Sequence, residues 1–258
     1  MKIVSTGKTL ASEDFYRRKL QVRKKKIIFS ALGILIALLA ILIVLRLESF
    51  QIRDIEVVGA EVIGADRVTK EADTFLSGRY LWIIPKNSTF IYPDGSLEKF
   101  LLKSFPRFSS IDLSLSSTKR LVVSVVEREP HTLLCQNLQS DCYFLDSTGF
   151  VFDKAPFFSR GVYFTHFIEA RPEEFLGKKL LGNFEDLSKF VKNFKSESIE
   201  IAEDYKLRLK SGTLIIWKKD VDLGKIYENL QAFLKNPQVN LEKLKEIDLR
   251  TPNKVFYK

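Results

Sequence analysis

Histidine and cysteine are the residues of this sequence with the most specific chemistry, and each occurs only twice. His131 and His166 are far apart in the chain, and neither has a cysteine or carboxylate partner at the spacing of metal ligands. His131 follows a proline, a context typical of a solvated loop histidine. The sequence therefore predicts no metal site and no cofactor.

Other catalytic patterns are weak. Asp146-Ser147-Thr148-Gly149 is similar to an aspartic protease loop, but its spacing is one residue too long and no second copy exists. A turn between two short strands is the better interpretation. Glu127 and Glu129 flank Arg128 and could form an acid–base pair, although solvated charges are the expected state. The chain has no nucleophile elbow and no glycine-rich phosphate loop. We therefore expect a protein that is not an enzyme.

An uninterrupted apolar run occupies residues 27–45. It contains no charged residue, and at 1.5 Å per residue it would extend about 28 Å, close to the thickness of bilayer hydrocarbon. Its outer end, Leu45-Arg46-Leu47-Glu48, lacks the small residues of a signal-peptide cleavage site. The run is predicted to be an uncleaved transmembrane helix.

The positive charge of the chain is concentrated before this run. Residues 1–26 carry a net charge of +7, out of +9 for the whole chain, and the basic cluster Arg23-Lys24-Lys25-Lys26 adjoins the apolar segment. Basic residues close to a span stay in the cytoplasm. The sequence therefore predicts a type II protein of the cell membrane, with a cytoplasmic N-terminus and residues 46–258 outside. Because the outer part is nearly neutral, nucleic acid is not an expected partner.

Both cysteines lie in the predicted outer part, where an oxidising environment permits a disulfide. Six residues separate Cys135 from Cys142, and a hairpin loop could place the two opposite each other. Two buried thiols are the alternative, and the spacing alone leaves the choice open.

Residues 46–128 predict an α+β module. Strand-like alternation at 50–58 is followed by helical periodicity from about 66 to 76 and again from about 94 to 105, with an irregular aromatic stretch at 80–92 between them. Two strands follow, at 111–115 and 121–126. Two helices can cover one face of such a three-stranded sheet.

Residues 129–258 predict a second, mostly β domain with about two helices. The helices are expected at 184–194 and 222–235. A hairpin with Ser211-Gly212 as its loop is expected near the middle, because glycine supplies the positive φ of that turn. The expected strands are 132–135, 143–145, 150–152, 162–165, 206–210, 213–217, 244–249 and 254–257.

Four segments resemble the FtsQ/DivIB family of bacterial cell-division proteins. They match its first outer strand, the end of its POTRA module, its "Y-x-x-D-x-x-G-x-x-F" hairpin and its final "I-D-x-R" strand pair. The resemblance covers nearly the whole chain from residue 17, although the cysteines are not a hallmark of the family. The matching segments are Phe50–Gly59, Leu121–Pro130, Tyr143–Phe152, and Ile247–Arg250 with Lys254–Tyr257.

The resemblance implies a POTRA-like domain at 46–128, a β domain at 129–258 and a place in the division septum. Proteins of this family are non-enzymatic scaffolds that recruit small bitopic coiled-coil proteins, FtsB and FtsL, and help to control septal peptidoglycan synthesis. Other division proteins would bind through the POTRA-like domain.

The terminal strand is the expected docking edge for these partners, because the sequence stops directly after it and a sheet edge can accept another strand. The partner-binding residues would be Arg250, Lys254, Val255, Phe256 and Tyr257. Arg250 would pair with a partner carboxylate. A solvated charge at Arg250, and a strand covered by the helix at 222–235, are the alternatives.

Two other classes of function remain. The chain could be a membrane-anchored extracytoplasmic enzyme, or an enzyme accessory, with a site that the sequence does not reveal. A module that binds lipid or nucleic acid is a weaker alternative, because residues 46–258 contain no basic cluster comparable to the one before the span.

The charge asymmetry around residues 27–45 gives a direct test of topology. Protease added to intact spheroplasts is expected to digest the outer part and to leave a small fragment that contains the tail and the span. Immunoblotting with an N-terminal tag would detect this fragment. Full protection of residues 46–258 would contradict the predicted orientation.

Overall fold

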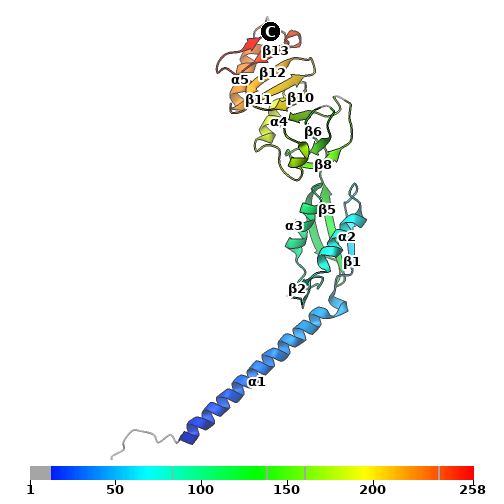
Figure 1. Ribbon diagram of the computed structural model, residues 1–258, viewed down its shortest axis with the longest axis vertical. Helices are drawn as coiled ribbons and strands as arrows, with labels where there is room; N and C mark the ends of the chain where they lie inside the picture. Colours follow the sequence, from blue (N-terminus) through cyan, green and yellow to red (C-terminus); the bar gives the residue numbers. More distant parts are fainter. Residues whose placement is uncertain (1–12, 83, 138, 160, 238) are drawn as a thin grey trace, which may run out of the picture. The chain divides into compact units, whose positions relative to one another are not determined.

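The computed structural model describes residues 13–258 apart from 83, 138, 160 and 238 (Figure 1). It is a mixed α+β structure with five α-helices and a large β-sheet in the described part, as the sequence predicts. Contacts divide the chain into two units. One comprises residues up to Glu56 with Lys70–Asp94 and Ser114–Val122; the other comprises Val57–Thr69, Gly95–Leu113 and Val123–Lys258. The domain limits expected from the sequence stay a prediction.

Helix α1 (Glu13–Arg46) contains the predicted span and continues without a break into the basic segment before it. Within the described residues, it is the one helix that is long and apolar enough to cross a membrane. Its side chains from Lys19 to Ile41 are all exposed, which is the pattern of a helix that buries its apolar surface in something other than its own chain. Residues 1–12 of the predicted tail lie outside the described part.

A short hairpin, β2 (Arg79–Tyr80) and β3 (Ile84–Pro85), occupies the stretch that the sequence predicts to be irregular. Strands of two residues are too short to show an alternating pattern of apolar and polar residues in the sequence. Contacts outside the two strands also stabilise the hairpin. The Lys86 amide donates to the Gly78 carbonyl at 3.0 Å, and the Lys86 ammonium lies over the rings of Phe75 and Tyr80.

The other elements of residues 46–128 follow the predicted order. They are η1 (Glu48–Phe50), β1 (Asp54–Val58), α2 (Ala65–Leu76), α3 (Asp94–Ser104), β4 (Phe108–Leu115) and β5 (Arg120–Glu127). The sheet order is β1-β5-β4. The central strand β5 buries every second side chain, because the sheet is covered on one face. Pro106 lies two residues after the end of α3, as expected for a residue that stops a helix.

A nine-stranded mixed sheet contains the remaining strands, in the order β14-β13-β12-β11-β10-β9-β6-β7-β8. Pairs β9–β10, β6–β9 and β12–β13 are parallel. The strands are β6 (Thr132–Cys135), β7 (Cys142–Leu145), β8 (Val151–Ala155), β9 (Thr165–Ile168), β10 (Ser196–Ile201), β11 (Asp204–Leu209), β12 (Leu214–Lys218), β13 (Glu246–Asp248) and β14 (Phe256–Tyr257).

Two differences from the sequence-based prediction concern the middle of this sheet. The strand expected at 162–165 lies at Thr165–Ile168 instead, and β10 was not predicted. Strand β10 has only two apolar residues, Ile199 and Ile201, because its other face carries Ser198 and Glu200. A strand between two neighbours can be this polar when one of its faces is not covered.

The main core lies between one face of the large sheet and the helices α4 (Phe184–Lys192) and α5 (Leu223–Leu234). Trp217 is fully buried there, with its ring 5.2 Å from Phe190 and 5.4 Å from Tyr205. Both tryptophans lie among apolar residues in the sequence, yet their surroundings differ. Trp217 is in the core, whereas Trp82 is 90% exposed in the β2–β3 turn.

The segment around Asp146 forms the expected turn between β7 and β8. The Asp146 carboxylate accepts hydrogen bonds from the Thr148 hydroxyl and from the amides of Thr148 and Phe150, and it pairs with Arg128. Burial opposes ionisation of Asp146, but these hydrogen bonds outweigh it and hold its pKa below the ordinary value. At Gly149, with φ +80°, a Cβ atom would lie 2.3 Å from the Phe184 ring, so no larger residue fits.

The expectation that Glu127 is a solvated charge is wrong. Its side chain is 12% exposed and accepts hydrogen bonds from the amides of Val62 and Ile63 and from Arg107. Arg107 also pairs with Asp153 at 2.8 Å. These contacts engage the Glu127 carboxylate in holding the end of β5 in place, so it is not a free group for acid–base chemistry.

His131 is exposed, as expected, but His166 is buried between the rings of Phe164 and Phe184. Its Nδ1–H donates to the Leu133 carbonyl at 3.3 Å. Burial lowers the pKa of His166 from 6.5 to about 4; the hydrogen bond to the Leu133 carbonyl opposes this shift, and His131 adds to it. The folded chain therefore keeps this imidazole neutral.

The pKa of His166 predicts a loss of stability in acid. Between pH 6.5 and about 4 the unfolded chain binds a proton that the folded chain does not, so the free energy of unfolding falls as the pH falls. A tenfold change in proton affinity corresponds to about 1.4 kcal/mol, so the loss approaches about 3 kcal/mol at pH 4. Urea unfolding of the detergent-solubilised chain at several pH values measures it.

Two variants isolate the contribution of His166. His166→Gln cannot titrate and should flatten the pH dependence relative to the wild type, whereas His131→Gln at the exposed position should alter it less, because burial of His166 is the main cause of its lowered pKa. Equal pH dependence in the wild type and in His166→Gln would show that other groups cause the acid sensitivity.

Candidate interaction site at the C-terminal sheet edge

The nine-stranded sheet has two edge strands, β8 and β14, which differ in how far other segments cover them. The start of β8 is covered by the segment at 177–180: the Val151 amide donates to Lys178 at 2.9 Å, and the Gly177 amide donates to Val151 at 2.8 Å. Phe150 forms a further bridge with Lys179. In the described part of the chain, β14 pairs with β13 alone.

The ladder between β13 and β14 determines which backbone groups point outward. Phe256 lies opposite Asp248, Tyr257 lies opposite Ile247, and Lys258 exchanges two hydrogen bonds with Glu246 at 3.1 and 3.2 Å. Backbone groups of successive residues alternate in direction along an antiparallel strand. The N–H and C=O of Tyr257 therefore point away from β13, toward the open side of the sheet.

The side chains of the terminal segment differ in what they contact. Val255 packs against the main core, and the Tyr257 ring lies 5.1 Å from Phe233 of α5 while remaining 60% exposed. Phe256 points to the opposite face and is 55% exposed. The Lys258 ammonium pairs with Glu246 at 2.8 Å, and Lys254 is exposed. Helix α5 thus supports one face of β14 without covering its edge.

Strand β14 is shorter than the strand predicted at 254–257. The chain turns at Thr251–Lys254, where the Lys254 amide donates to the Thr251 carbonyl at 3.2 Å and Asn253 adopts φ +57°. Asparagine tolerates this left-handed conformation better than most residues. The turn ends only at Lys254, so the paired segment begins at Phe256.

Arg250 already has partners within the chain. Its Nε and Nη2 donate to Asp248 at 3.0 and 2.7 Å, and its Nη1 donates to Asp204 at 3.2 Å. The hydrogen bond from Arg250 is the main cause that lowers the pKa of Asp248, and the two carboxylates raise the pKa of Arg250. The Arg250 side chain is 45% exposed, and these hydrogen bonds hold its guanidinium in one orientation at the surface. No sequence pattern indicated the contact with Asp204, which is 46 residues away in the chain.

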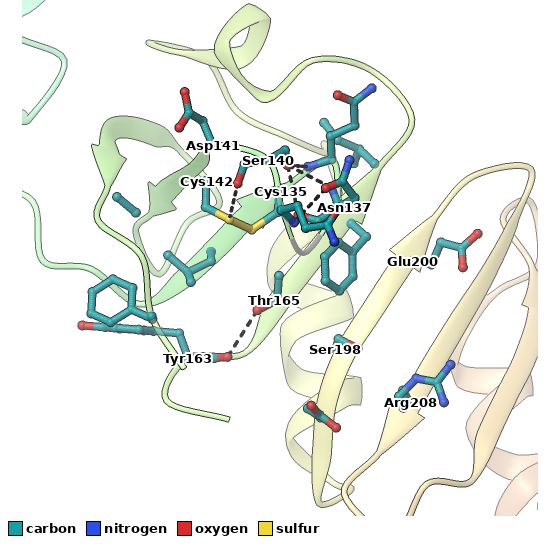
Figure 2. Close-up of a pocket in the computed structure, with 18 of the residues that line it drawn as sticks. Cys135, Asn137, Ser140, Asp141, Cys142, Tyr163, Thr165, Ser198, Glu200 and Arg208 are labelled. Carbon is teal, nitrogen blue, oxygen red and sulfur yellow. Dashed lines mark hydrogen bonds between the residues drawn. A yellow bond between two sulfur atoms is a disulfide. The ribbon is translucent and has the colours of Figure 1, made fainter. Parts of the chain in front are cut away.

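A pocket with a volume of about 890 Å³ lies on the sheet face opposite α4 and α5 (Figure 2). One end is formed by the 135–142 loop and by Tyr163, and the other end by charged side chains of β10 and β11. Among those, Glu200 and Lys206 form an ion pair at 2.7 Å. The described residues contain no group of three or more His, Cys, Asp or Glu side chains that could hold a metal ion.

Cys135 and Cys142 form a disulfide at the rim of this pocket, with an S–S distance of 2.01 Å and a Cα–Cα distance of 4.4 Å. The two residues lie directly opposite each other on β6 and β7. The Ser140 hydroxyl accepts hydrogen bonds from the amides of Gln136 and Asn137 and so shapes the loop. The bond closes a hairpin that the β6–β7 ladder already aligns.

Comparison with protein-family models and with curated protein sequences gives no match for this chain.

Loss of the disulfide should have a moderate effect. Because it closes a short loop, the entropic model gives a contribution of roughly 2–3 kcal/mol, and a Cys135→Ser/Cys142→Ser variant should lose about that much or less in its free energy of unfolding. Urea unfolding measures the loss. Alkylation with iodoacetamide under native, non-reducing conditions, followed by mass spectrometry, gives an independent check: labelling of both cysteines would contradict the disulfide.

Proposed function

We propose that the chain is a non-enzymatic scaffold of the bacterial division machinery, which recruits a partner by adding the partner's strand to β14. The open edge of β14 is the observation that carries this proposal. At the other end of the sheet the start of β8 is covered by residues 177–180, whereas at β14 the N–H and C=O of Tyr257 point outward beside an exposed Phe256.

The arrangement before the large sheet supports the same function. Apart from the short β2–β3 hairpin, the main elements of residues 46–128 are a strand, two helices and two strands, with the last strand in the centre of the sheet, which is compatible with a POTRA-like domain. Helix α1 would anchor the chain in the cell membrane with its N-terminus inside, and both folded domains would lie outside at the septum.

The groups at the edge of β14 suit the addition of a partner strand. Main-chain hydrogen bonds provide affinity, and alternate side chains determine register. A partner strand would meet the outward groups of Tyr257 and, on the two faces, the side chains of Phe256 and Tyr257. The exposed Lys254 would favour a partner with acidic residues, while lysine at an edge discourages pairing between copies of the chain.

Arg250 would contribute as a pre-oriented hydrogen-bond donor, because the two carboxylates that hold it offset its charge. Asp248 and Asp204 hold its guanidinium, so a partner carboxylate would bind a group that is already oriented and would lose less side-chain entropy. In this proposal the partners are FtsB-like and FtsL-like bitopic proteins. Their capture would help to control septal peptidoglycan synthesis, and the POTRA-like domain would bind other division proteins.

A proline at Val255 tests the proposal. By the alternation of the ladder, the Val255 amide points to the same open side as that of Tyr257, so Val255→Pro removes an outward N–H but keeps the bonds between Lys258 and Glu246. Capture of co-expressed FtsB-like and FtsL-like proteins by the detergent-solubilised chain should fall at least about tenfold, the effect of roughly 1.4 kcal/mol.

Val255→Ala is the matched control, because it removes the same packing against the core but keeps the N–H. It should capture the partners nearly as well as the wild type, and circular dichroism should show that both variants are folded. Lys254→Glu tests the charge without disturbing the Arg250 cluster, which Arg250→Glu would convert into three adjacent carboxylates. Full capture by Val255→Pro and Lys254→Glu would place the partner elsewhere.

A further inference from the structure

The turn between β2 and β3 exposes two large apolar side chains next to each other. Leu81 is 84% exposed and Trp82 is 90% exposed, and both have positive φ, of 46° and 66°. Hairpin turns of this conformation normally contain glycine or asparagine. Leu81 and Trp82 gain little packing from the described part of the chain, so the fold does not account for them.

The position of the hairpin indicates what these side chains meet. Strand β3 lies against α1, and both belong to the same unit of the structure (Figure 1). From Lys19 to Arg46 the side chains of α1 are exposed except Leu42 and Leu45, which are partly buried. Leu45 is the last residue of the apolar run. The hairpin is therefore held beside the end of the helix, where bilayer hydrocarbon would give way to headgroups.

Other exposed apolar side chains gather at the same end. Leu47 directly follows α1 and is 46% exposed, and Phe90 is 59% exposed with its ring 5.0 Å from that of Phe50. Backbone bonds connect this region further, because the Thr89 amide donates to Phe50 and the Gln51 side-chain amide donates to the Arg46 carbonyl. Leu47 and Phe90 are thus connected to the end of α1.

We infer that the β2–β3 turn is a second membrane contact, with Trp82 in the headgroup region and Leu81 at the edge of the hydrocarbon. Tryptophan favours this region because its ring is apolar and its N–H can bond to headgroups or water. The inference rests on α1 spanning the membrane, as proposed above. It adds a peripheral contact that would limit rotation of the first outer module about the end of α1.

The chain offers a clean spectroscopic test, because it contains only two tryptophans and α1 contains neither. The full chain is reconstituted into vesicles of phosphatidylcholine and phosphatidylglycerol, with part of the phosphatidylcholine brominated either near the headgroup or near the chain end. In Trp217→Phe, fluorescence from Trp82 should fall roughly twofold with the shallow bromines and less with the deep ones.

Trp82→Phe is the matched control, because the remaining Trp217 is fully buried in the protein core and should not respond to bromine at either depth. If Trp217→Phe destabilises the core, the difference between the wild type and Trp82→Phe gives the same information with the core intact. Quenching of Trp82 by aqueous acrylamide but not by brominated lipid would overturn the inference. Protection of Trp82 from both quenchers would also overturn it, since the turn would then be covered by protein.

Flotation separates this inference from the proposal on which it rests. A chain that floats with the vesicles after alkaline washing, but whose Trp82 is not quenched by lipid, is anchored by α1 without the hairpin contact. A chain that is stripped from the vesicles by the wash contradicts the span itself.

Discussion

The Arg128–Asp146 ion pair is the interaction on which the arrangement of β5 and the β7–β8 turn depends. Arg128 follows β5 directly, its Nε donates to the Pro106 carbonyl at 3.2 Å, and its guanidinium lies 4.0 Å from the Phe150 ring. Asp146 organises the turn whose Gly149 lies against Phe184 of the main core. Both side chains are mostly buried, and removal of one partner from such a pair costs roughly 3–5 kcal/mol, because the other charge is left without compensation. One residue pair thus links the end of β5, a tight turn and the packing of α4.

Much of the fold could be predicted because its signals are local. The apolar run of α1, the periodicity of α5 and the alternation of β5 each follow from burial of one surface. The structure shows α5 and β5 close to their expected limits, and α1 ends one residue after the predicted span, although it begins 14 residues earlier. The turn at Gly212, with φ +94°, is also where the Ser211-Gly212 pair predicted it. In each of these cases the residues that determine the structure are neighbours in the sequence.

The features that could not be predicted depend on residues far apart in the chain. Strand β10 is recognisable only beside β9 and β11, and Glu127 is buried only because the amides of Val62 and Ile63 meet it. The same is true of the candidate site: Arg250 could be selected from its segment, but its contact with Asp204 could not. The difference in exposure between Trp82 and Trp217 likewise becomes apparent only in the folded structure, since both lie among apolar residues in the sequence.

The order of strands in the large sheet has a consequence for biogenesis. From β10 to β14 each new strand is added next to the one before it, with α5 making the crossover between β12 and β13. A chain that crosses the membrane from its N-terminal side would therefore complete this half of the sheet one strand at a time, and β14 would be placed last of the nine. Until then β13 or β12 forms the edge. A partner that recognises β14 would bind only chains whose sheet is complete, so partner capture would itself act as a check on finished folding.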